Sequence, residues 1–137
     1  MLKVEDLYPI ILETLSSGKT FLMPIKGTSM QPMLHTGDIV ELAPIDNIKK
    51  NDIIFYKRSD GSFVLHRVYK VEKDSYTMIG DHQIVLEKNV LRDDCFAKVI
   101  SYTKKNKKRK LKGIRYGLYL FSLRFFLVRR FYIKCLH

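Results

Sequence analysis

The chain opens with apolar residues at helical spacing. Val4, Leu7, Ile11 and Leu15 belong to a set of six apolar residues spaced mostly three or four apart, and the acidic residues between them fall on the other side of a helix. The Ser-Ser-Gly sequence at residues 16–18 is typical of a helix end. We therefore predict a short amphipathic helix whose apolar stripe packs against the core.

After this helix the pattern changes to short β-branched and aromatic runs separated by turn residues. The Asp60-Gly61 pair between two of these runs is typical of a tight hairpin, because tight hairpin turns need residues that tolerate positive φ. Six strands are predicted, over residues 20–26, 39–42, 53–57, 63–71, 76–79 and 96–102. Links of the hairpin type predict a mostly β, antiparallel domain over residues 1–103.

The distribution of charge separates a second region from this body. The formal net charge is +11, yet residues 1–103 contain 13 Lys and Arg against all 14 Asp and Glu. Residues 104–137 contain the other 12 basic residues and no acid. A basic run at 104–112 precedes a stretch at 114–133 that is rich in Phe, Tyr and Leu, which predicts a basic amphipathic C-terminal helix. This tail either folds back onto the body or lies in the plane of an anionic bilayer, and we expect the bilayer.

Other compositional features limit the location and chemistry of the protein. No segment reaches the roughly 18 to 20 uncharged apolar residues that a spanning helix needs, and the N-terminal segment lacks the pattern of a secretory signal peptide. We therefore expect a peripheral, membrane-associated protein, otherwise cytoplasmic, with no spanning helix. Cys95 and Cys135 form neither a disulfide framework nor a metal-ligand spacing, and we expect no metal or cofactor.

The segment with the most specific chemistry runs Gly27-Thr28-Ser29-Met30-Gln31-Pro32-Met33-Leu34, followed by Gly37-Asp38. A serine hydroxyl is a weak nucleophile that needs a base within hydrogen-bond distance and backbone donors for the developing oxyanion. A glycine shortly before the serine lets the backbone come close to a substrate carbonyl. Ser29 is thus a candidate nucleophile, with Gly27, Thr28 and Met30 as the loop around the oxyanion.

This segment resembles the nucleophile box of the type I signal peptidases and their LexA-like relatives, Gly-x-Ser-Met-x-Pro-x-Leu-x-x-Gly-Asp. The later boxes of that superfamily resemble further segments of this chain, in the same order and over about half of its length. These segments are Asn51-Asp52-Ile53-Ile54-Phe55, Leu65-His66-Arg67-Val68, Gly80-Asp81 and Ala97-Lys98-Val99. The resemblance implies a LexA/signal-peptidase-like antiparallel core. It also implies a serine endopeptidase that cleaves a signal or leader peptide after a small residue, so the expected partner is a peptide or preprotein.

His66 stands where many bacterial signal peptidases and the LexA group have lysine, as in the endoplasmic-reticulum type of signal peptidase. The resemblance therefore implies that His66 is the general base. An imidazole titrates near neutrality, so we expect cleavage to rise through one ionisation at roughly pH 6 to 7. A histidine base needs a carboxylate to fix its tautomer. Asp81 of the Gly-Asp box is the first candidate, and Glu87, which lies nearest to the acid of the histidine-type relatives, is the second.

Two departures from the signal peptidases keep other functions open. Gly27-Thr28 lacks the serine that commonly precedes the nucleophile, and no N-terminal membrane anchor is expected. The alternatives are a LexA-like or phage-repressor-type regulatory domain, a degenerate peptidase that only holds peptides, and a nucleic-acid-binding module that uses the basic tail. Only 26 residues precede Gly27, which disfavours a repressor with an upstream DNA-binding domain. The body contains no aromatic RNA-binding motif, so nucleic acid is not expected as a partner.

Overall fold

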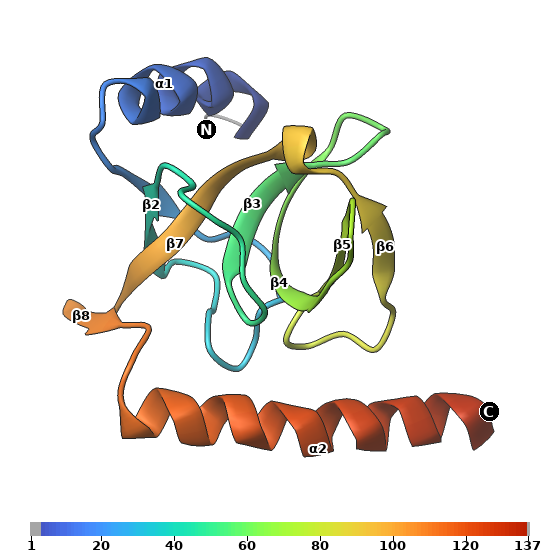
Figure 1. Ribbon diagram of the computed structural model, residues 1–137. Helices are drawn as coiled ribbons and strands as arrows, with labels where there is room; N and C mark the ends of the chain where they lie inside the picture. Colours follow the sequence, from blue (N-terminus) through green and yellow to red (C-terminus); the bar gives the residue numbers. More distant parts are fainter. Residues whose placement is uncertain (1–3, 137) are drawn as a thin grey trace.

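The computed structural model describes residues 4–136 and, within the last helix, the side chains as far as Phe125. The two helices lie on opposite sides of the β structure (Figure 1). The elements are α1 (Val4–Ser16), β1 (Phe21–Pro24), β2 (Ile39–Ala43), β3 (Ile53–Lys57), β4 (Phe63–Val71), β5 (Tyr76–Ile79), β6 (Glu87–Val90), a short 3₁₀ turn (Arg92–Asp94), β7 (Cys95–Lys104), β8 (Lys107–Lys110) and α2 (Ile114–Leu136). The predicted fold class, mostly antiparallel β with a helix at each end, is confirmed.

The strands form one antiparallel sheet in the order β1-β2-β7-β3-β4-β5-β6, with β8 paired to β7. β7 pairs with three other strands, which are β2, β3 and, near its end, β8. Irregular pairing interrupts four of these ladders, and such bulges bend and twist a sheet. The segment after β5 lies against the loop between β1 and β2.

Two hydrophobic clusters lie on the two faces of the central strands. The first contains Ile53 and Phe55 of β3 together with Ile11 and Leu15 of α1, which confirms that the apolar stripe of the first helix packs into the core. The second contains Ile54 and Tyr56 of β3 with Val68, Met78, Val90 and Cys95. Both faces of β3 are therefore buried, which explains its uninterrupted apolar sequence.

The basic run at 104–112 differs from the prediction, because part of it belongs to the sheet. Lys105 and Asn106 both have positive φ and form the two-residue turn of a hairpin between β7 and β8. The β body thus continues past residue 103 to Lys110. α2 then runs beneath the sheet from Ile114 (Figure 1). Within residues 4–136, no helix combines the length and the apolar character needed to cross a membrane.

Candidate active site

Ser29 lies in the loop between β1 and β2, and backbone hydrogen bonds close the base of this loop. The amide of Ile25 donates to the carbonyl of Asp38 at 2.7 Å, and the amide of Gly37 donates to the carbonyl of Ile25 at 3.0 Å. Gly27 has a φ of 101°, a conformation that L side chains rarely adopt. A glycine two residues before Ser29 is therefore required by the shape of the loop.

Three apolar side chains anchor this loop in the first hydrophobic cluster. Met30, Met33 and Leu34 are buried there, and the amide of Leu34 donates to the carbonyl of Met30 at 2.9 Å. Thr28 is exposed and Ser29 is partly exposed. Of the residues predicted around the oxyanion, Met30 thus places its side chain in the core and Thr28 remains at the surface. The buried side chains fix the loop from the side of the core, and Ser29 stays accessible from the other side.

The Gly80-Asp81 segment holds the backbone of Ser29 directly. The amide of His82 donates to the carbonyl of Ser29 at 2.9 Å. A Cβ atom on Gly80 would lie 2.5 Å from that carbonyl oxygen and 2.9 Å from Oε1 of Gln83, which is closer than real Cβ contacts allow. The glycine in this segment is needed because the two backbones touch.

His66 is buried on β4, with 3% of its surface exposed, and a tyrosine connects it to a carboxylate. In the β3–β4 register Ile54 faces His66 and Tyr56 faces Val64, so Tyr56 and His66 are diagonal neighbours on one face. The Tyr56 hydroxyl lies 3.2 Å from Nδ1 of His66 and donates to Oε2 of Glu87 at 2.8 Å. That carboxylate oxygen is itself 4.0 Å from Nδ1 of His66. The imidazole is therefore connected to Glu87 through the phenol.

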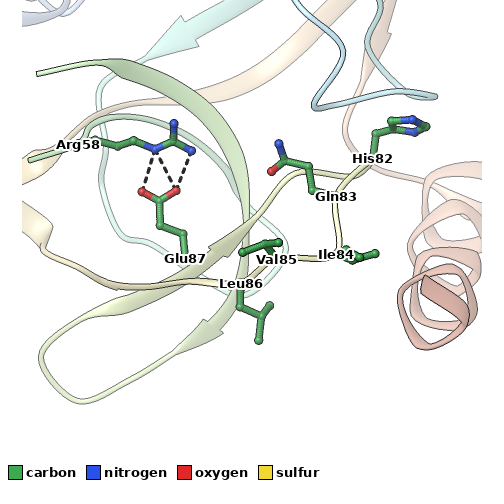
Figure 2. A pocket seen from close by; sticks show the side chains of 7 residues that line it. All are labelled: Arg58, His82, Gln83, Ile84, Val85, Leu86 and Glu87. Atoms are coloured by element: carbon green, nitrogen blue, oxygen red, sulfur yellow. Dashed lines mark hydrogen bonds and ion pairs between the residues drawn. The ribbon is translucent and has the colours of Figure 1, made fainter. Parts of the chain in front are cut away.

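Arg58 fixes Glu87 from the other side. Its guanidinium donates from Nε to Oε1 at 2.9 Å and from Nη2 to Oε2 at 3.0 Å (Figure 2). Burial alone would raise the pKa of Glu87, but the hydrogen bonds from Arg58 and Tyr56 lower it, so this carboxylate is ionised near neutral pH. A continuous polar chain thus leads from the partly exposed pair Arg58–Glu87 through Tyr56 to the buried His66.

The ionisation of His66 differs from the sequence-based expectation. Burial, reinforced by the positive charge of Arg58, lowers the pKa of His66 from 6.5 to about 4. The charge of Glu87 opposes this shift without cancelling it. The imidazole is therefore neutral at physiological pH, and its approach to Glu87 is not a salt bridge. The expected ionisation at 6 to 7 did not include the desolvation that this position imposes.

The two candidate acids have different partners. Asp81 is fully buried and accepts hydrogen bonds from Nε of Arg67 at 2.8 Å, from Nη2 of Arg67 at 2.9 Å and from the Tyr119 hydroxyl at 2.7 Å. The interaction with Asp81 raises the pKa of Arg67 although burial alone would lower it, so this is a charged pair in the core. Glu87, in contrast, is the carboxylate that approaches Nδ1 of His66. Asp81, the first candidate, is thus bound to Arg67 and Tyr119, and the second candidate, Glu87, is the carboxylate that lies near His66.

A comparison with family models identifies the core that carries these groups. The model described as Peptidase S24-like matches residues 2–97, which is more than half of the chain. The chain belongs to the Peptidase S24-like family. A comparison with curated proteins gives no match. The matched region of the S24-like chain contains Ser29, His66, Asp81 and Glu87, and it ends within β7, before β8 and α2.

In this S24-like core, Arg67 joins the serine loop to the strand of the histidine. Its Nη2 donates to Sδ of Met33 at 3.2 Å, so the residue next to His66 touches the loop that carries Ser29. Among residues 4–125, whose side chains are described, no hydrogen bond joins Oγ of Ser29 to His66. Such bonds are often long in a free enzyme and shorten when substrate binds. These contacts fix the backbone of the Ser29 loop against β4 and the segment after β5.

A cavity of about 710 Å³ opens beside Glu87. Figure 2 shows the side chains that line it, which are Arg58, His82, Gln83, Ile84, Val85, Leu86 and Glu87. The segment from Gln83 to Leu86 has no regular secondary structure, and Val85 and Leu86 are exposed. The cavity thus combines the charged pair Arg58–Glu87 with the exposed apolar side chains of Val85 and Leu86.

Tyr56 and Arg58 were not recognised from the sequence as parts of the site. Tyr56 could have been found from the hairpin register, because the Asp60-Gly61 turn fixes which residues of β3 and β4 share a face. Arg58 offers no such signal, since its partner Glu87 is 29 residues away. In the described part of the chain, no three His, Cys, Asp or Glu residues gather as metal ligands would.

Proposed function

We propose that this member of the Peptidase S24-like family is a serine endopeptidase with Ser29 as nucleophile, His66 as general base and Glu87 as the orienting acid. Oγ of Ser29 attacks the substrate carbonyl while Nε2 of His66 takes its proton. The tetrahedral intermediate collapses with transfer of that proton to the leaving amine, which gives an acyl-enzyme. Water, deprotonated by the same imidazole, then attacks the ester and releases the acid product and free Ser29.

The observation that carries this proposal is the phenol between His66 and Glu87. Tyr56 donates its single proton to Glu87, which is ionised, so its oxygen can only accept from Nδ1 of His66. Nδ1 must then carry the proton of the neutral ring, and Nε2 presents the free lone pair that a general base needs. Arg58 neutralises much of the charge of Glu87. The hydrogen bonds through Tyr56 therefore orient the imidazole of His66 more than they raise its basicity.

The substrate that this arrangement favours is a signal or leader peptide bound in extended form. The irregular segment from Gln83 to Leu86 provides the exposed apolar side chains of Val85 and Leu86 beside the cavity, and it leads from the Gly80–His82 contact with Ser29 to Glu87. Cleavage after a small residue follows from the resemblance to signal peptidases. We also propose that the enzyme works as a peripheral protein at a membrane surface, on grounds given in the next subsection.

Cleavage of a synthetic signal peptide with alanine before the scissile bond tests the proposal. Ser29→Ala and His66→Ala should each reduce kcat/KM by about 10³-fold or more, and the double variant should be little worse, because the two residues act as a unit. A Ser29→Ala protein with full activity, or additive losses, would contradict the assignment. If the native protein binds the peptide and never cleaves it, the alternative of a non-catalytic S24-like domain is supported instead.

A further inference from the structure

The inner face of α2 is fixed against the body of the protein. The Tyr116 hydroxyl accepts from Nη1 of Arg67 at 2.7 Å, and the Tyr119 hydroxyl donates to Asp81 at 2.7 Å. Both rings also lie within 6 Å of the guanidinium carbon of Arg67, and Leu123, one turn further on, is buried. These contacts determine which side of the helix faces outward.

No element of the described structure covers the outer side of α2 (Figure 1). This side carries a stripe of exposed apolar side chains. Ile114, Leu118, Phe121 and Phe125 follow one another at intervals of four and three residues and are 84, 63, 55 and 65% exposed. The rings of Phe121 and Phe125 touch edge to face, with centroids 5.2 Å apart. Single exposed apolar residues are ordinary, but a continuous stripe of four marks a contact surface.

Exposed positive charge lies on the helix that carries this stripe and on the strand before it. Arg115 and Arg124 are exposed on α2, and all four residues of β8, which directly precedes the helix, are exposed Lys or Arg. Residues 104–137 contain 12 Lys and Arg and no acid. A second copy of the chain would bring the same charges together and be repelled. A nucleic acid would match the charge but would leave Ile114 and Leu118 without an apolar partner.

We propose that the outer face of α2 and the lysines of β8 bind the surface of an anionic membrane. The apolar stripe enters the boundary between headgroups and acyl chains, while the Lys and Arg side chains reach the lipid phosphates. Because the inner face of α2 touches Arg67 and Asp81, and the neighbouring His82 amide holds Ser29, the site stands about one helix diameter, roughly 10 Å, above the membrane. Only this last consequence rests on the proposed function; the binding itself does not depend on catalysis.

Co-sedimentation with vesicles tests the proposal, with full-length Ser29→Ala protein so that cleavage plays no part. We expect strong binding to vesicles of phosphatidylglycerol and phosphatidylcholine in equal amounts, weak binding to pure phosphatidylcholine, and partial release in high salt. The variant Leu118→Ser/Phe121→Ser should bind at least about tenfold less. Ile10→Ser/Leu12→Ser, which changes two exposed apolar residues of α1 on the opposite side of the β structure (Figure 1), should change binding less than about twofold.

A second pair of variants tests the charge. Lys107→Gln/Lys110→Gln/Lys112→Gln should weaken vesicle binding at least about tenfold. Removing the same number of exposed lysines from the body, with Lys19→Gln/Lys73→Gln/Lys88→Gln, should have a much smaller effect.

Thermal unfolding of each variant shows whether the fold is intact. The proposal is overturned if the full-length protein ignores anionic vesicles at low salt, or if the stripe variant binds like its control. It is also overturned if the protein binds single-stranded RNA in its place. In each of these cases the peptide-cleavage assay can still succeed, so failure here is distinguishable from failure of the proposed enzyme.

Discussion

The buried, neutral state of His66 makes the stability of the protein depend on pH in a defined window. The pKa of His66 is about 4 in the folded protein and close to 6.5 when the side chain is exposed to water. Between these values the unfolded chain binds a proton that the folded protein does not. Stability must therefore fall as the pH drops from about 6.5, and the loss is complete only below about 4.

The magnitude follows from the two ionisations. Applying the linkage relation to a shift of this size gives a loss of about 2 kcal/mol between pH 7 and about pH 5, and about 3 kcal/mol by pH 4. His66 is almost entirely buried, so solvent screening does not reduce this loss of stability. For a small domain this is a large part of the free energy of unfolding. Carboxylates whose pKa is lowered, such as Glu87 and Glu41, lose their contribution mainly at still lower pH.

Urea unfolding of the native protein and of His66→Gln, at pH 7 and at about pH 5, isolates this term. Glu87, whose pKa is lowered, stays mostly ionised between pH 7 and about 5 in the native protein, so the difference between the pH-induced losses of the two proteins should be about 2 kcal/mol. The rate of peptide cleavage should depend on the same imidazole, so it should stay constant from neutral pH to about 5 and decline below that pH. Equal pH dependence in the two proteins, together with an activity ionisation at 6 to 7, would show that the imidazole is not desolvated as described.

The polar contacts of the site lead to three further expectations. Tyr56→Phe should lower kcat about tenfold to a hundredfold with little change in KM, because the imidazole loses the group that fixes its tautomer, and fluorogenic peptide kinetics would show it. Glu87→Gln should lower kcat by about 10²-fold or more. Asp81→Asn should mainly destabilise the fold, by about 3–5 kcal/mol in urea titrations, because the buried guanidinium of Arg67 loses its counter-charge; the opposite pattern would exchange their roles. Gly80→Ala should lower the melting temperature and activity together, since its Cβ would collide with the carbonyl of Ser29, and an unchanged melting temperature would contradict that contact.

Most of the fold could be predicted from hydrophobic patterning. The six predicted strands are present with ends within two residues of those expected, because each buries an apolar face. β6 and β8 were not predicted, because neither buries an apolar face. Only Val90 of β6 is buried, and β8 is exposed throughout, so both depend on backbone pairing with a neighbour rather than on a pattern of their own. Patterning cannot indicate strands of this kind.

The chemistry of the site could be predicted only in part. The sequence of the Ser29 loop and the position of His66 were specific enough to nominate a nucleophile and a base. The choice between Asp81 and Glu87 was not accessible, because it depends on which acid is held by Arg67 and which lies near His66 once the sheet has bent. The low pKa of His66 likewise follows from its depth in the core, which no local sequence encodes.

Labelling by a fluorophosphonate, read as intact mass and by peptide mapping, tests the central claim that Ser29 is an activated nucleophile. The account predicts a single adduct on Ser29, none on Ser29→Ala, and much slower labelling of His66→Ala, because the hydroxyl reacts only when Nε2 of the imidazole accepts its proton. Absence of an adduct on the folded native protein, or equal labelling of native protein and Ser29→Ala, would contradict it.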